Sequence, residues 1–97
     1  MFVDVYMSAA ETVPRADVSD ALEDRLPPGC EVVGAGSGTG VSNVDIEILD
    51  RSMLPAVIEI LQSLGLRGDT VLALSDTGER IHLAQLHGPR PGDIPVR

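Results

Sequence analysis

The 97-residue sequence predicts a single α+β domain in which two helices cover one face of an antiparallel sheet. Three observations lead to this fold class. Short segments alternate apolar and polar residues, which is typical of half-buried strands. Two longer segments carry apolar residues at spacings of three and four, the periodicity of a helix with one buried side. These segments follow one another in the order β-α-β-β-α-β, along a chain with room for one hydrophobic core.

A strand and a helix are expected first. Residues 2–8 are rich in the β-branched and aromatic residues that favour strands. Pro14 favours the first turn of a helix, and Val18 and Leu22 lie four residues apart on one side of that helix. The prolines that begin at Pro27 end it. We therefore expect the side that carries Val18 and Leu22 to face the core.

Two strands follow, separated by a segment that is rich in glycine. The second strand is expected from about residue 30 to residue 34, and the segment 34–40 is expected to be a flexible connection. The third strand, 41–49, shows the clearest alternation in the chain, because three apolar residues alternate with Asp45 and Glu47. One side of this strand should therefore face the core and the other side should be acidic.

The second half of the chain adds a helix and one or two strands. Residues 54–64 carry the apolar stripe of the second helix. Residues 70–75 form the fourth strand, and residues 80–86 allow a fifth, shorter strand after a turn. We expect one domain over residues 1–87, followed by an irregular tail over residues 88–97, which contain three prolines.

This order of elements predicts a ferredoxin-like βαββαβ sandwich with a four-stranded antiparallel sheet, two helices on one face and the fifth strand as an addition. Right-handed crossovers place the first and third strands side by side at the centre of the sheet. The second face of the sheet is then left open. The polar residues that alternate with core residues should share this open face: Asp4, Tyr6, Glu31, Asp45 and Glu47.

Acidic residues dominate the charge of the chain and are concentrated in its first half. Fifteen Asp and Glu face seven Arg and no Lys, which gives a formal net charge of -8. Residues 1–50 contain ten acids and two arginines, whereas residues 51–97 contain five of each. Because a strongly negative chain repels phosphate backbones, we expect no nucleic-acid partner.

Cysteine content, hydropathy and motif spacing exclude several classes of site. The single cysteine, Cys30, excludes an internal disulfide and a cysteine-rich zinc site. No stretch approaches the roughly 20 apolar residues of a membrane span. The first residues also lack a basic, apolar leader, so we expect no membrane partner and a cytoplasmic location. No catalytic constellation is recognisable, and we therefore expect no enzyme activity, no cofactor and no metal site.

The acidic residues of the open face nevertheless allow three interpretations. They can form a solvated surface, or a docking surface for the arginines and lysines of a protein partner, with Tyr6 as an anchor. In the third interpretation Asp4 and Asp45 hold a divalent metal in a metal-dependent enzyme. A second copy of the chain would also cover an open face, which would make the protein a homodimer.

Three short stretches resemble a group of small stand-alone bacterial proteins, over residues 31–74. They are Glu31–Gly34, Val44–Glu47 and Ile60–Gly68. In that group a strand ending in glycines precedes an Asp-Ile-Glu strand, and a helix ends in Leu-Gly-small-Pro-Lys-Gly. This chain departs from the last motif, because Leu66 and Arg67 stand where the small residue, the proline and the lysine would fall.

In size and acidity the chain also resembles the immunity proteins that bacteria make against their own secreted toxins. This resemblance implies an inhibitor that neutralises a basic toxin domain through an acidic surface. The alternative function is a small-ligand regulatory module that resembles the ACT domains, which share the βαββαβ order. The glycine-rich segment supports that alternative, because glycine allows the backbone to approach a ligand closely.

Overall fold

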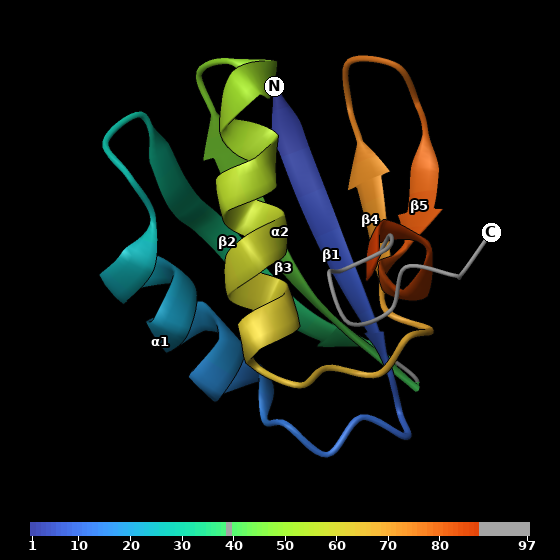
Figure 1. The fold of residues 1–97 in the computed structure, drawn as a ribbon. Coiled ribbons are helices and arrows are strands. Elements are labelled where there is room, and N and C mark those ends of the chain that lie inside the picture. The colour runs from blue at the N-terminus through green and yellow to red at the C-terminus, as the bar shows by residue number, and fades with distance from the viewer. Residues whose placement is uncertain (39, 88–97) are drawn as a thin grey trace, which may run out of the picture.

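The computed structural model describes residues 1–38 and 40–87 and has an α+β fold (Figure 1). Five strands form one antiparallel sheet in the order β2-β3-β1-β4-β5. The strands are β1 (Phe2–Ser8), β2 (Cys30–Gly38), β3 (Val41–Ile48), β4 (Val71–Leu74) and β5 (Arg80–His82). The predicted α+β class is therefore confirmed, and the sheet has five strands rather than four. The expected tail, 88–97, lies outside the described residues.

Two α-helices lie on one face of this sheet, α1 (Arg15–Arg25) and α2 (Leu54–Ser63) (Figure 1). Two short 3-10 helices, η1 (Arg51–Met53) and η2 (Leu83–His87), precede α2 and follow β5. No helix in the described part of the chain has the length and apolar character needed to cross a membrane.

The core fills the space between the helices and the sheet. Alternate residues of the central strand β1, beginning with Val3 and Val5, point to the helices and are fully buried. The hydrophobic side chains that are at most 1% exposed are Val3, Val5, Met7, Val18, Leu22, Val44, Ile46, Ile48, Val57, Leu61, Leu72, Leu74 and Leu83. All are aliphatic, so the fold depends on the burial of many small apolar surfaces rather than on aromatic packing.

The two helices differ in how much they contribute to this core. α2 buries four residues, Leu54, Val57, Ile60 and Leu61, whereas α1 buries only Val18 and Leu22. The remaining surface of α1 is strongly acidic. Its four acids, Asp17, Asp20, Glu23 and Asp24, are all exposed to solvent on the helical side of the molecule.

The glycine-rich segment is not the flexible connection that the sequence predicts. β2 continues through it to Gly38 and pairs with β3, with Gly34 opposite Asp45 and Gly36 opposite Asn43. A Cβ atom on Gly34 would lie 3.2 Å from Asp45 Oδ2, and one on Gly36 would lie 3.2 Å from Asn43 Oδ1. These glycines therefore leave space for the polar side chains of β3 to lie over the backbone of β2. The loop that supported an ACT-like ligand site is, up to Gly38, a paired strand.

The last predicted strand is also shorter than expected. β5 ends at His82, and the chain then turns into η2. Leu83 is fully buried, and its backbone N–H donates to the carbonyl oxygen of Thr70 at 2.7 Å. Leu83 thus joins the core at the point where the strand ends, and its burial stabilises this end of the sheet.

Candidate functional site

The five residues that the sequence predicts as a binding surface lie on the sheet face opposite α1 and α2, which we call the open face. Asp4 and Tyr6 occupy positions on β1 between fully buried residues. Asp45 and Glu47 alternate in the same way with the buried residues of β3. Glu31, on β2, is exposed. The period of two along each strand thus places all five side chains away from the helices.

The register of the strands brings four of these residues together as two opposed pairs. Asp4 lies directly opposite Asp45 across β1 and β3, and Glu31 lies directly opposite Glu47 across β2 and β3. We call these four residues the acidic cluster. Opposed like charges on neighbouring strands destabilise a sheet by roughly 0.2–1 kcal/mol per pair. Tyr6 is not part of this cluster, because it lies opposite Asn43 and Val71.

The Asp4 and Asp45 carboxyl groups interact across the two strands. Burial raises the pKa of Asp4, and the hydrogen bond to Asp45 and the negative charge of Asp45 raise that pKa further. On its other side, Asp45 Oδ1 accepts a hydrogen bond of 2.9 Å from Asn43 Nδ2. The Asn43 amide therefore orients the Asp45 carboxylate, and the raised pKa of Asp4 favours the protonated form of Asp4.

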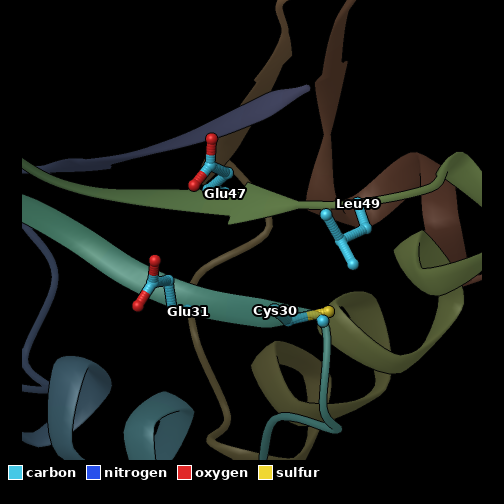
Figure 2. Close-up of a pocket in the computed structure, with 5 residues that line it drawn as sticks. Cys30, Glu31, Glu47 and Leu49 are labelled. Atoms are coloured by element: carbon cyan, nitrogen blue, oxygen red, sulfur yellow. The ribbon is translucent and has the colours of Figure 1, made fainter.

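The Glu31–Glu47 pair lines a pocket at the end of the open face where β2 begins (Figure 2). The pocket has a volume of about 260 Å³ and is also lined by Gly29, Cys30 and Leu49. Figure 2 shows the two carboxylates projecting side by side from neighbouring strands. Leu49 is 78% exposed and forms an apolar wall beside them. Two carboxylates next to an apolar wall suit a lysine or arginine side chain, which has a cationic end and an aliphatic stem.

Cys30 contributes no reactive group to this pocket. Its Sγ lies 3.5 Å from the Sδ of Met53, and the residue packs against the hydrophobic core. Burial raises the pKa of the thiol, so the nucleophilic thiolate form is disfavoured at neutral pH.

A second pocket lies at the opposite end of the open face, where β1 ends and β3 and β4 begin. Its volume is about 410 Å³, and Tyr6 and Arg80 line it. The guanidinium carbon of Arg80 lies 5.3 Å from the centre of the Tyr6 ring. Sequence reasoning missed Arg80, because nothing in the local pattern shows that an arginine 74 positions further along the chain reaches Tyr6. We call this second pocket the tyrosine pocket.

The positions of the acidic side chains bear on whether Asp4 and Asp45 could hold a divalent metal ion. Within residues 1–38 and 40–87, no group of three or more His, Cys, Asp and Glu side chains is arranged to hold a metal ion. Among these residues Asp4 and Asp45 lie opposite each other without a third potential ligand grouped with them. The cluster therefore offers negative charge over an area of the sheet rather than a coordination shell.

Comparisons with known proteins found nothing similar to this chain, since no family model, curated protein or solved structure matches it. The open face remains the candidate functional surface. That face has an acidic end with one pocket, and an end with the tyrosine pocket.

Proposed function

We propose that this chain binds a basic protein through the acidic cluster and acts as an inhibitor of the toxin-immunity type, with no catalytic activity of its own. The single observation that carries the proposal is the position of four paired carboxylates on a sheet face that neither helix covers. A partner that supplies cations to this face removes the repulsion within each pair.

The distribution of ion pairs supports this proposal. The described residues form ion pairs from Arg51 to Asp76 and Glu79, and from Arg67 to Asp69. None of these pairs includes a member of the acidic cluster. Within residues 1–38 and 40–87, two arginines thus pair with acids elsewhere and no ion pair includes the carboxylates of the cluster, which a basic partner could therefore meet.

The proposed mode of binding has two parts. The net charge of -8 attracts a basic partner over a distance of about one Debye length, roughly 8 Å at physiological ionic strength, and so accelerates the encounter. A lysine or arginine side chain of the partner then occupies the pocket between Glu31 and Glu47, with its stem against Leu49. Inhibition follows when the bound chain covers the functional surface of the partner.

A titration with an arginine-rich peptide, followed through the amide chemical shifts of the protein, tests where cations bind. The molecule contains its own competitor for this test, because α1 exposes four acids on the other side of the sheet. We expect the shifts to change around the acidic cluster and to be reversed by salt. Equal changes on α1 would show that the peptide responds only to net charge, and would refute the proposal.

A pair of matched variants measures the contribution of the cluster. E31Q/E47Q and E23Q/D24N each remove two negative charges, from the open face and from α1 respectively. We expect E31Q/E47Q to weaken peptide binding roughly two- to thirtyfold, since exposed ion pairs contribute about 0.2–1 kcal/mol each. E23Q/D24N should have a clearly smaller effect, and an equal effect would contradict the proposal.

The inhibitory role needs the natural partner. Proteins that co-purify with the chain from its host would be identified, and their activity measured with increasing amounts of the chain. We expect loss of activity at equimolar chain, and loss of this inhibition in E31Q/E47Q but not in E23Q/D24N. A bound partner that stays fully active would refute the inhibitory role. Recovery of the free chain as a dimer through the open face would refute the docking surface.

We also propose that the fold is a ferredoxin-like sandwich in which β1 to β4 form the basic unit and β5 is an edge addition. The order β2-β3-β1-β4 and the antiparallel pairing of all neighbours support this assignment. Deletion of the β5 hairpin would test it. We expect the remaining chain to keep the β1–β3 pairing in amide exchange measurements.

A further inference from the structure

The tyrosine pocket has the size and the lining of a small-molecule site. Its volume of about 410 Å³ falls within the range of roughly 300–1,000 Å³ that is usual for such sites. The side chains of Tyr6, Val41 and Val71 provide apolar walls, and Val41 is 44% exposed. These residues come from three neighbouring strands of the sheet, so the walls stand on a rigid part of the fold.

Among the described residues that line this pocket, Arg80 is the one cation. In the described part of the chain Arg80 contacts the Tyr6 ring and no carboxylate lies within ion-pair distance of it. This is notable in a chain with fifteen acids and seven arginines. A guanidinium that lies over an aromatic ring contacts the ring through its own planar face. The N–H groups at the edge of the guanidinium are then free to donate to a ligand. Arg80 is therefore a preoriented donor for a carboxylate.

Two further polar residues line the pocket. Ser8 has a buried Oγ with no hydrogen-bond partner among the described residues, which is unfavourable unless a ligand or a water satisfies it. Asp69 also lines the pocket, but its carboxylate accepts hydrogen bonds of 3.2 Å from Nε of Arg67. The negative charge of Asp69 is thus balanced by Arg67, and the charge of Arg80 remains unbalanced.

We propose that the tyrosine pocket binds a small carboxylate with an apolar body. The carboxylate pairs with the guanidinium of Arg80, and the apolar body packs against Tyr6, Val41 and Val71. A ligand with a single negative charge fits best, because the pocket holds one unpaired cation and the chain as a whole repels a more highly charged anion. This site is separate from the acidic cluster, which attracts ligands of opposite charge.

Three probes that share one ring and differ in charge test the proposal: phenylacetate, phenylacetamide and phenethylamine. Amide chemical shifts of the full chain would be followed while each probe is added to millimolar concentration. We expect phenylacetate to shift the resonances of Tyr6, Val41, Val71 and Arg80, and phenylacetamide to bind at least about tenfold more weakly, because a charge-assisted hydrogen bond is lost. Equal binding of all three probes, or no shift with phenylacetate, would overturn the proposal.

Matched variants then assign the charge that recognises the ligand. Arg80→Gln should weaken phenylacetate binding about tenfold or more and leave phenylacetamide binding unchanged. Arg25→Gln removes the same charge from α1, on the helical side, and should leave both unchanged. The amide spectrum of each variant shows whether it is folded. Unchanged phenylacetate binding in Arg80→Gln would refute the proposed role of Arg80.

The same variants separate this proposal from the proposed function. E31Q/E47Q should bind phenylacetate as the original chain does, and Arg80→Gln should retain its affinity for the arginine-rich peptide. The inference would be overturned if E31Q/E47Q weakened phenylacetate binding and Arg80→Gln did not. The ligand would then lie in the pocket between Glu31 and Glu47 and not in the tyrosine pocket. The proposed docking of a basic protein would stand in that case.

Discussion

Replacement of Asp4 by asparagine should stabilise the protein at neutral pH. Asp4 faces Asp45 directly across β1 and β3, at the centre of the sheet. Because burial, the hydrogen bond to Asp45 and the charge of Asp45 all raise the pKa of Asp4, the folded state binds a proton at Asp4 more tightly than the unfolded state does. The asparagine amide can donate to the Asp45 carboxylate without carrying a negative charge.

The direction of the pH dependence follows from proton linkage. Between the ordinary carboxyl pKa, about 3.9, and the higher pKa of folded Asp4, the folded state binds more protons than the unfolded state. The free energy of unfolding therefore falls as the pH rises through this window, and the loss is complete above the folded pKa. At neutral pH the original chain thus carries the full cost of the opposed charges, and the variant does not.

The size of the gain is set by the interaction that is removed. One directly opposed pair of like charges costs roughly 0.2–1 kcal/mol. For a domain of this size that corresponds to an increase in melting temperature of roughly 1–8 °C. The gain should be confined to the pH range in which Asp4 is ionised, and it should vanish in acid.

Urea unfolding of D4N, at neutral pH and at a pH below the ordinary carboxyl pKa, measures both effects. The matched control is D24N, which removes one negative charge from an exposed position on α1. D4N should gain stability relative to D24N at neutral pH and lose this advantage in acid. A D4N variant that is less stable than D24N at neutral pH would refute the interpretation of the Asp4–Asp45 pair. The same stability advantage over D24N at both pH values would also refute it.

D4N should also bind an arginine-rich peptide more weakly. This result would show that Asp4 lowers the stability of the fold but contributes to binding.

Two further predictions concern the core and the thiol. Leu83→Ala should lower the free energy of unfolding by about 2–5 kcal/mol, because Leu83 is fully buried, whereas Leu49→Ala, at a position 78% exposed, should change it by less than about 0.5 kcal/mol. Chemical denaturation compares the two, and similar losses would show that η2 does not pack as described. Cys30 should react with a thiol reagent more slowly in the folded chain than in urea, because burial raises its pKa; equal rates would contradict its contacts with Met53 and the core.

Much of this architecture is determined by local patterns in the sequence. The strict alternation around Asp45 and Glu47 assigns one side of β3 to the core and the other to the open face, because side chains of a strand alternate with a period of two. The same reasoning applies to Asp4 and Tyr6 on β1. Together with the predicted neighbourhood of β1 and β3, this alternation allowed the candidate surface to be predicted as five residues on one face.

The tertiary structure decided which of those residues meet. Glu31 lies opposite Glu47 in the register of β2 and β3, which carries a shift between Val32 and Gly34. Asp4 lies opposite Asp45 through the separate register of β1 and β3. The glycines of β2 predicted a loop, because glycine has a low propensity to form strands. The sheet overrides that propensity, because the space above Gly34 is needed by the side chain of Asp45.

The sequence by itself thus determined the charge of the chain, its periodicities and the face to which each strand residue belongs, all of which depend on near neighbours. Only the folded structure decided the register, the early end of β5 and the contact between Tyr6 and Arg80. These features depend on residues that are far apart along the chain, and their pairing is set by the burial of a shared core rather than by any local preference.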